Sequence, residues 1–129
     1  MNRWELTIGA PSDNGEHHAF DIMELWWGRK VFHLLGTLKI HRVTVLRTDD
    51  NEFGEIRVGA KLGHGCAMFG PHVAIFNAAG SQNMDFNETS PEEGFPMRFD
   101  VSTLYDRGIP ISSIIVRLEG ELDGTLTPL

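Results

Sequence analysis

The sequence is poor in the residues that stabilise a chain by means other than a hydrophobic core. It holds one cysteine, Cys66, so an intramolecular disulfide is excluded. No apolar run approaches the roughly 20 residues with which a helix spans a bilayer. Residues 1–5 lack the apolar segment of a secretory signal. We therefore expect a protein with neither a signal peptide nor a membrane span.

Positive charge is also scarce. Eleven Lys and Arg residues stand against 18 Asp and Glu residues, which leaves a net charge of −7. The basic residues are scattered, and Arg29 with Lys30 is the closest cluster. The sequence therefore lacks the basic patch that nucleic acids and anionic membranes require. A charge of this size keeps a small domain soluble. The alternative interpretation is a partner with a basic surface, or cations.

The rest of the composition is that of a globular domain. Hydrophobic residues make up 41% and charged residues 22% of the chain, and both values are ordinary. A length of 129 residues suits one domain. Such a chain buries roughly two thirds of its unfolded surface on folding. We expect residues 1–129 to form a single domain whose core needs neither a metal nor a disulfide.

Strand-like alternation, broken by Gly, Pro, Asn and Asp, is the dominant pattern. It predicts strands at residues 4–8, 31–35, 37–47, 55–62, 73–77, 97–101 and 109–119. The apolar residues expected to face inward in the clearest of these strands are Ile56, Val58, Ala60, Leu62, Met97, Phe99, Val101, Ile114, Val116 and Leu118. Residues 17–27 fit both a helix and a strand, and their aromatic residues favour a strand. Leu122 and Leu126 suit further pairing beyond the last predicted strand.

The connections between strands are predicted from composition. Residues 37–47 carry apolar side chains in both phases, which indicates a strand covered on both faces or a β-bulge near Arg42. Residues 48–54 have turn composition, so 37–47 and 55–62 are predicted to form a hairpin. Residues 78–94 are polar and predict a long loop, and loops of that length are usually functional or mobile.

Seven to eight short strands at regular spacing, with little helix, are typical of two packed antiparallel sheets. The sequence therefore predicts an all-β fold, specifically a two-sheet β-sandwich of Ig-like, C2-like or jelly-roll type. A small closed β-barrel is the alternative.

Two groups of residues have the chemistry of metal ligands. His64, Cys66 and His72 combine imidazole and thiolate groups, which bind zinc, copper or iron. The alternative is that Cys66 is a small buried hydrophobe. The second group is an acidic loop formed by Asp49, Asp50, Asn51 and Glu52. Calcium takes oxygen ligands from such loops, although turn geometry alone accounts for their Asp and Asn residues. We expect no resident cofactor, with a transition metal or calcium as the alternative.

Two adjacent tryptophans are the candidate interaction residues. On a strand, Trp26 and Trp27 would face opposite sides, so that one enters the core and the other is exposed. An exposed Trp beside Arg29 suits a subunit contact or a sugar-binding platform. The alternative is that both tryptophans lie under loops.

No catalytic motif accompanies these patterns. The sequence contains neither a Gly-x-Ser-x-Gly motif nor a phosphate-binding glycine loop. We expect a non-catalytic protein that binds a protein partner or assembles with itself. Structural subunits of viruses or phages and small acidic inhibitor or immunity proteins have this character, which places the chain in the cytoplasm or in a virion. The alternatives are a metal-dependent protein and a carbohydrate-binding module.

Overall fold

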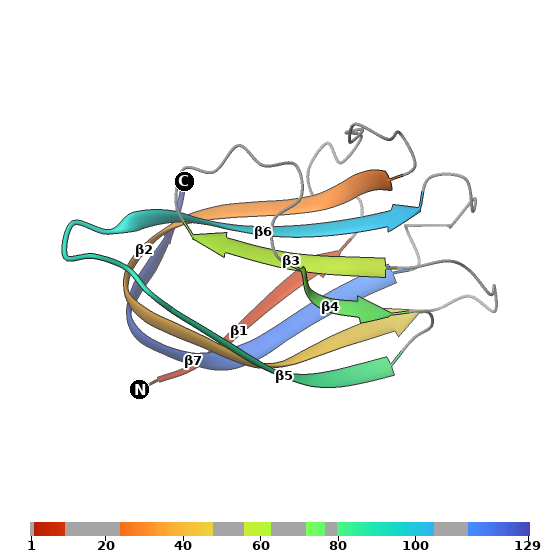
Figure 1. The fold of residues 1–129 in the computed structure, drawn as a ribbon, viewed down its shortest axis with the longest axis horizontal. Helices are drawn as coiled ribbons and strands as arrows, with labels where there is room; N and C mark the ends of the chain where they lie inside the picture. Colours follow the sequence, from red (N-terminus) through yellow and green to blue (C-terminus); the bar gives the residue numbers. More distant parts are fainter. Residues whose placement is uncertain (1, 10–23, 48–55, 63–71, 77–79, 105–113) are drawn as a thin grey trace.

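The computed structural model describes residues 2–9, 24–47, 56–62, 72–76, 80–104 and 114–129 (Figure 1). These residues form seven strands: β1 (Asn2–Gly9), β2 (Glu24–Arg47), β3 (Ile56–Leu62), β4 (His72–Phe76), β5 (Gly80–Thr89), β6 (Phe95–Leu104) and β7 (Ile114–Pro128). Every pairing between them is antiparallel. The predicted all-β antiparallel class is confirmed. In the described ranges, no helix is long and apolar enough to cross a bilayer.

The 24-residue strand β2 organises the sheet, because it has different neighbours along its length. The strand order is β1-β7-β2-β6-β3-β4, and β5 also pairs with β2. One edge of β2 pairs with β6 over residues 24–34 and with β5 over residues 37–45. The other edge pairs with β7 over residues 32–47. In Figure 1, β2 curves from the layer of β6 and β3 into the layer of β7 and β5.

This curvature folds the sheet over a single core. Trp4 of β1 stacks on Phe99 of β6 with ring centroids 5.6 Å apart, although β1 and β6 are not neighbours in the sheet. The edge of the Phe32 ring contacts Phe99 as well, at 5.9 Å. Of the residues predicted to face inward, all are buried except Leu62, which is partly buried and packs against the core. The fully buried side chains that β1 and β2 add are Ile8, Leu34, Leu38, Ile40, Val43 and Val45.

A pair of glycines allows β2 and β7 to bend together. Gly36 of β2 lies opposite Gly124 of β7, and their φ angles are +118° and +131°. A Cβ on Gly36 would lie 2.1 Å from the Asp123 carbonyl oxygen, and one on Gly124 would lie 2.0 Å from the Leu35 carbonyl oxygen. Only glycine combines such a φ with so close an approach of two backbones. The sequence predicted that Gly36 separates two strands. Instead, Gly36 lies within the continuous strand β2 and allows it to bend.

Ser90 completes the hydrogen bonding at this bend, where the neighbour of β2 changes from β6 to β5. The Gly36 N–H donates to Ser90 Oγ at 2.8 Å, and the Ser90 hydroxyl donates to the Gly36 carbonyl oxygen at 3.2 Å. The Ser90 N–H donates to the same carbonyl oxygen at 2.8 Å. A buried backbone group without such a partner costs free energy, so Ser90 substitutes for a paired strand residue.

Two predicted connections are wrong. Residues 37–47 do not form a hairpin with 55–62, because β2 pairs with β5, β6 and β7 while β3 pairs with β4 and β6. Much of the predicted loop 78–94 is strand β5, paired with residues 37–45. Its polar side chains are mostly exposed, so it is held in the sheet by its backbone bonds and by Phe86, which is partly buried against the core. β7 also extends the last predicted strand to Pro128, and the pairing expected at Leu122 and Leu126 is confirmed.

We expect Ser90→Ala to destabilise the protein by about 1–3 kcal/mol, because it leaves the partly buried Gly36 N–H without its acceptor. Thr89→Ala is the matched control. The Thr89 hydroxyl is exposed and lies 3.5 Å from the Thr37 hydroxyl. Its removal should therefore change the free energy of unfolding by no more than about 0.5 kcal/mol. Urea unfolding of both variants measures the difference. Equal free energies of unfolding would show that Ser90 does not support the bend.

Candidate functional site

A β-bulge in β2 shapes the outer surface of the sheet. Leu38 and Ile40 are fully buried, and after the bulge Val43 is buried in the opposite phase. His41 and Arg42, between them, are both exposed. The registers of β2 with β7 and with β5 both shift between Ile40 and Arg42. Of the two interpretations of residues 37–47, the register supports the bulge near Arg42, which places two polar side chains side by side on the outer face.

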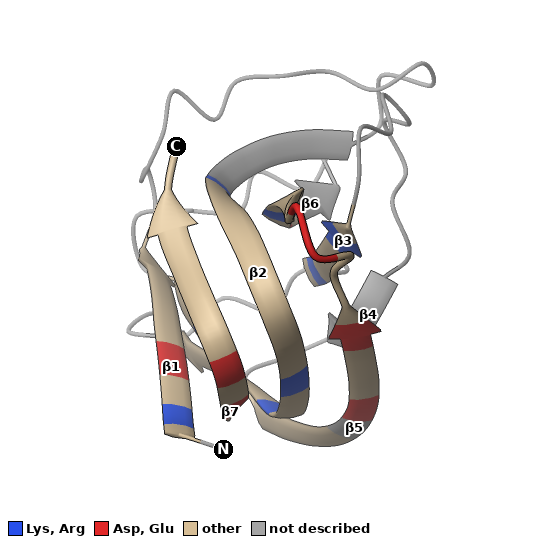
Figure 2. Ribbon diagram, turned by 90° about the vertical axis from the view of Figure 1, so that its left-hand side faces the viewer, with Lys and Arg blue, Asp and Glu red and all other residues tan. Residues whose placement is uncertain are grey.

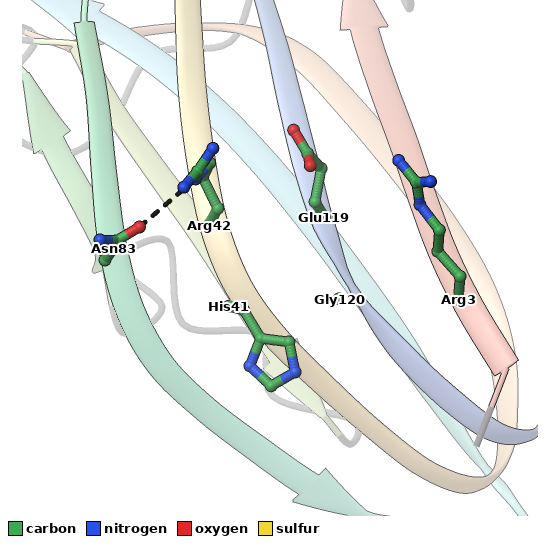
Figure 3. A pocket seen from close by; sticks show the side chains of 6 residues that line it. All are labelled: Arg3, His41, Arg42, Asn83, Glu119 and Gly120. Atoms are coloured by element: carbon green, nitrogen blue, oxygen red, sulfur yellow. Dashed lines mark hydrogen bonds between the residues drawn. The ribbon is translucent and has the colours of Figure 1, made fainter.

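These side chains line a pocket on the outer face of β1, β7, β2 and β5 (Figure 3). The pocket has a volume of about 360 Å³. Its lining residues are Arg3, His41, Arg42, Asn83, Glu119 and Gly120. Figure 3 shows Glu119 of β7 between Arg42 of β2 and Arg3 of β1. At Gly120 the bulged strand comes so close that a Cβ would lie 1.7 Å from the Lys39 carbonyl oxygen, which excludes a larger residue.

The strand register arranges the polar side chains of this face in rows that cross β1, β7 and β2. Basic and acidic residues therefore lie next to each other on these strands (Figure 2). The rows, each written from β1 to β2, are Arg3–Glu121–Lys39, then Glu5–Glu119–Arg42, then Thr7–Arg117–Thr44. Residues directly opposite each other on antiparallel strands interact, so unlike charges in a row stabilise the face and like charges weaken it.

Several of these groups already have partners on the face. His41 Nε2 lies 3.1 Å from Glu121 Oε2, and both side chains are about half exposed. This hydrogen bond lowers the pKa of Glu121 below its ordinary value, and the nearby charges of His41 and Lys39 lower it further. Arg42 Nε donates to Asn83 Oδ1 at 3.3 Å, and Arg42 lines the pocket beside it (Figure 3).

The other charged groups on the face make a long ion pair or none among the described residues. Arg117 Nε is 3.7 Å from Glu5 Oε1, within the range of an ion pair but too long for a hydrogen bond. Across the described ranges, Arg3, Lys39 and Glu119 make no ion pair. The pocket thus combines guanidinium donors with a carboxylate acceptor, which is suited to hydrogen bonding with polar groups of a partner.

The same face ends in an apolar row. Leu46 of β2 lies opposite Ile115 of β7, and their exposed fractions are 40% and 37%. Gly9 of β1 continues the row, and a Cβ there would meet no atom within 4 Å. Two large apolar side chains therefore project from the sheet beside open space, next to the polar rows. Apolar surface rimmed by polar groups is typical of protein interaction sites.

The interaction residues predicted from the sequence lie in the first part of β2. Trp26 and Arg29 are opposite Ser102 and Asp100 of β6, and the register shifts between Trp26 and Gly28, which places Trp27 at the irregularity. The positions of these side chains are outside what the structure describes. On the other edge of β2, pairing with β7 begins at Phe32, so residues 24–30 have no neighbouring strand there among the described ones.

The predicted metal ligands belong largely to parts of the chain that the structure does not describe. His64, Cys66, Asp49, Asp50 and Glu52 lie outside the described residues, and the backbone of His72 begins β4 opposite Gly59. In the described part of the chain, no three or more His, Cys, Asp and Glu side chains are grouped so as to hold a metal ion. Sequence reasoning did not find the outer-face pocket. The phase shift at Arg42 was the signal available, but the neighbours of Arg42 follow from long-range pairing.

Comparisons with protein-family models, with curated proteins and with solved structures find no match to this chain.

We expect His41→Ala to raise the pKa of Glu121 towards its ordinary value, because the hydrogen bond from His41 is the largest cause of the lowering. A lowered carboxyl pKa stabilises the folded state above the unfolded pKa, and this stabilisation is lost as the pH falls through the folded pKa. The variant should therefore lose less stability on acidification than the wild type. An NMR titration of the Glu121 carboxyl measures the shift. Arg42→Ala is the control, since Arg42 bonds to Asn83; an equal pKa rise in both variants would contradict the assignment to His41.

Proposed function

We propose that this chain is a non-catalytic interaction or assembly protein that binds a protein partner through the outer face of β1, β7, β2 and β5. The exposed pair Leu46 and Ile115 is the observation that carries the proposal. Isolated apolar residues on a surface are ordinary, but a cross-strand pair beside organised polar rows has the anatomy of an interface. The pocket with Arg3 and Glu119 supplies directional hydrogen bonding next to it.

The local charge of the face supports a protein partner. The chain as a whole carries a net charge of −7. The three polar rows, in contrast, combine four basic residues with three acidic ones, so the face does not repel an acidic partner. Such a partner includes another copy of this acidic chain. This role suits a structural subunit of a virus or phage particle, or a small inhibitor or immunity-type protein, in the cytoplasm or in a virion.

We expect the double change Leu46→Ser with Ile115→Ser to abolish partner capture without unfolding the protein, because both side chains are already partly exposed. Leu35→Ser is the matched control, since Leu35 is 41% exposed and lies in a different row. Tagged wild type and variants are used for affinity capture from the native host. Captured proteins, untagged copies included, are then identified by mass spectrometry, and binding is repeated with the purified partner by calorimetry.

Capture of the same partners, with equal affinity, by the wild type and by the double variant would contradict the proposal. A loss of capture in the Leu35→Ser variant as well would show that general surface apolarity, and not the Leu46–Ile115 row, causes the binding. Thermal unfolding of each variant separates a lost interface from a lost fold.

The Trp26–Trp27 prediction is tested separately. If these tryptophans anchor a contact along the first part of β2, replacing both with Ala should lower the assembly mass in native mass spectrometry while the Tm stays within a few degrees of that of the wild type. Arg29→Ala should also lower the assembly mass, to a smaller extent. An unchanged assembly mass would rule out this surface as a contact.

A further inference from the structure

Strand β1 has one edge that pairs with no other described strand. All eight residues of β1 pair with β7, and among the described strands none pairs with the opposite edge. In Figure 2, β1 forms the margin of the layer that also holds β7 and β2. The unpaired N–H and C=O groups of such an edge form a template for another strand. Proteins commonly blunt an edge with a proline or an inward-facing charge, and β1 has neither, since Trp4, Leu6 and Ile8 all face the core.

The sequence of β1 is complementary to itself. We propose that two copies of this chain pair along the free edges of β1, antiparallel to each other, with the two-fold axis at Trp4. A two-fold axis perpendicular to the sheet keeps the outer face on the same side in both copies, so residues that oppose each other share a face. With the axis at Trp4, Arg3 lies opposite the partner's Glu5, and Glu5 lies opposite the partner's Arg3. Two equivalent ion pairs result.

The neighbouring registers are less favourable. With the axis at Glu5, this residue would lie directly opposite the partner's Glu5, and like charges at that position are destabilising. With the axis at Leu6, Arg3 would lie opposite the partner's Gly9 and Glu5 opposite the partner's Thr7, so no ion pair forms. Charge therefore selects the register centred on Trp4, although this register pairs fewer residues than those centred on Glu5 and Leu6.

Arg3 is available for this contact, because it makes no ion pair within the described part of its own chain. The rows of the outer face also continue across the junction. The row Arg3–Glu121–Lys39 of one copy meets the row Glu5–Glu119–Arg42 of the other, and the residues at the junction have opposite charge. On the inner face, Trp4 is partly buried against Phe99, so pairing at the axis would cover more of its ring.

This inference concerns a different edge from the residue 24–30 segment and a different surface from the Leu46–Ile115 row. It therefore does not depend on the proposed function, and the two can fail independently. Arg3 lines the pocket as well as the β1 edge, so the two are separated with the Leu46→Ser/Ile115→Ser variant, which should lose partner capture and still pair through β1. Loss of the Trp26–Trp27 contact would leave the β1 pair intact.

Charge reversal with recombination tests the register. In sedimentation velocity and native mass spectrometry, the wild type should dimerise, and Arg3→Glu or Glu5→Arg alone should each weaken the dimer by at least about tenfold, because like charges then face each other twice. Mixing the two single variants should restore dimers, and these should be heterodimers, since each variant supplies the charge that the other lacks. Lys39→Glu is the matched control, with the same change in charge on β2, and should dimerise like the wild type.

Three results would overturn the proposal: a wild type that stays monomeric, single reversals that dimerise as well as the wild type, or a mixture that forms no heterodimer. Glu5→Arg also removes the contact with Arg117, so the Tm of each variant is measured first. If that variant is unfolded, hydrogen exchange of the wild type decides the question. The β1 amides should exchange faster on dilution into the monomer range, and concentration-independent exchange would overturn the pairing.

Discussion

The fold depends on the joint bend of β2 and β7. Gly36 and Gly124 lie opposite each other with positive φ angles, and their backbones approach too closely for any side chain. Ser90 then satisfies both backbone groups of Gly36 at the point where β6 gives way to β5. Without this bend, β2 could not place residues 24–34 and 37–45 in two layers, and Phe99 would not meet Trp4 across the core.

The outer face depends on a second local irregularity, the bulge at His41 and Arg42. Core packing requires buried residues in one phase before the bulge and in the other phase after it. The bulge inserts one extra residue that changes the phase, and the side chains of His41 and Arg42 are both exposed on the outer face. The pocket is therefore a consequence of how the core is filled. The small residue Gly120 opposite the bulge is part of the same arrangement, since it accommodates the closer Lys39 carbonyl.

The sequence was informative where burial repeats every second residue. The alternation at Ile56, Val58 and Ala60, and the phase change at Arg42, depend on one strand and its core, so they can be recognised locally. The pairing partners could not be recognised in this way. β5 is mostly polar, and its place beside β2 depends on backbone bonds, on Phe86 packed against the core and on the hydrogen bonds of Ser90. For the same reason the polar rows, which join residues over a hundred positions apart, were not predicted.

The placement of β7 also constrains the order of folding. β7 pairs with β1 and with residues 32–47 of β2, yet it follows both in the chain by many tens of residues. Contacts so distant in sequence form slowly, because loop closure has to precede the gain from burial. While β7 is still being synthesised, β1 and much of β2 lack their partner, and Ile8, Val43 and Leu38 remain without their cover. The chain therefore passes through a period on the ribosome in which one edge of its longest strand is still without β7.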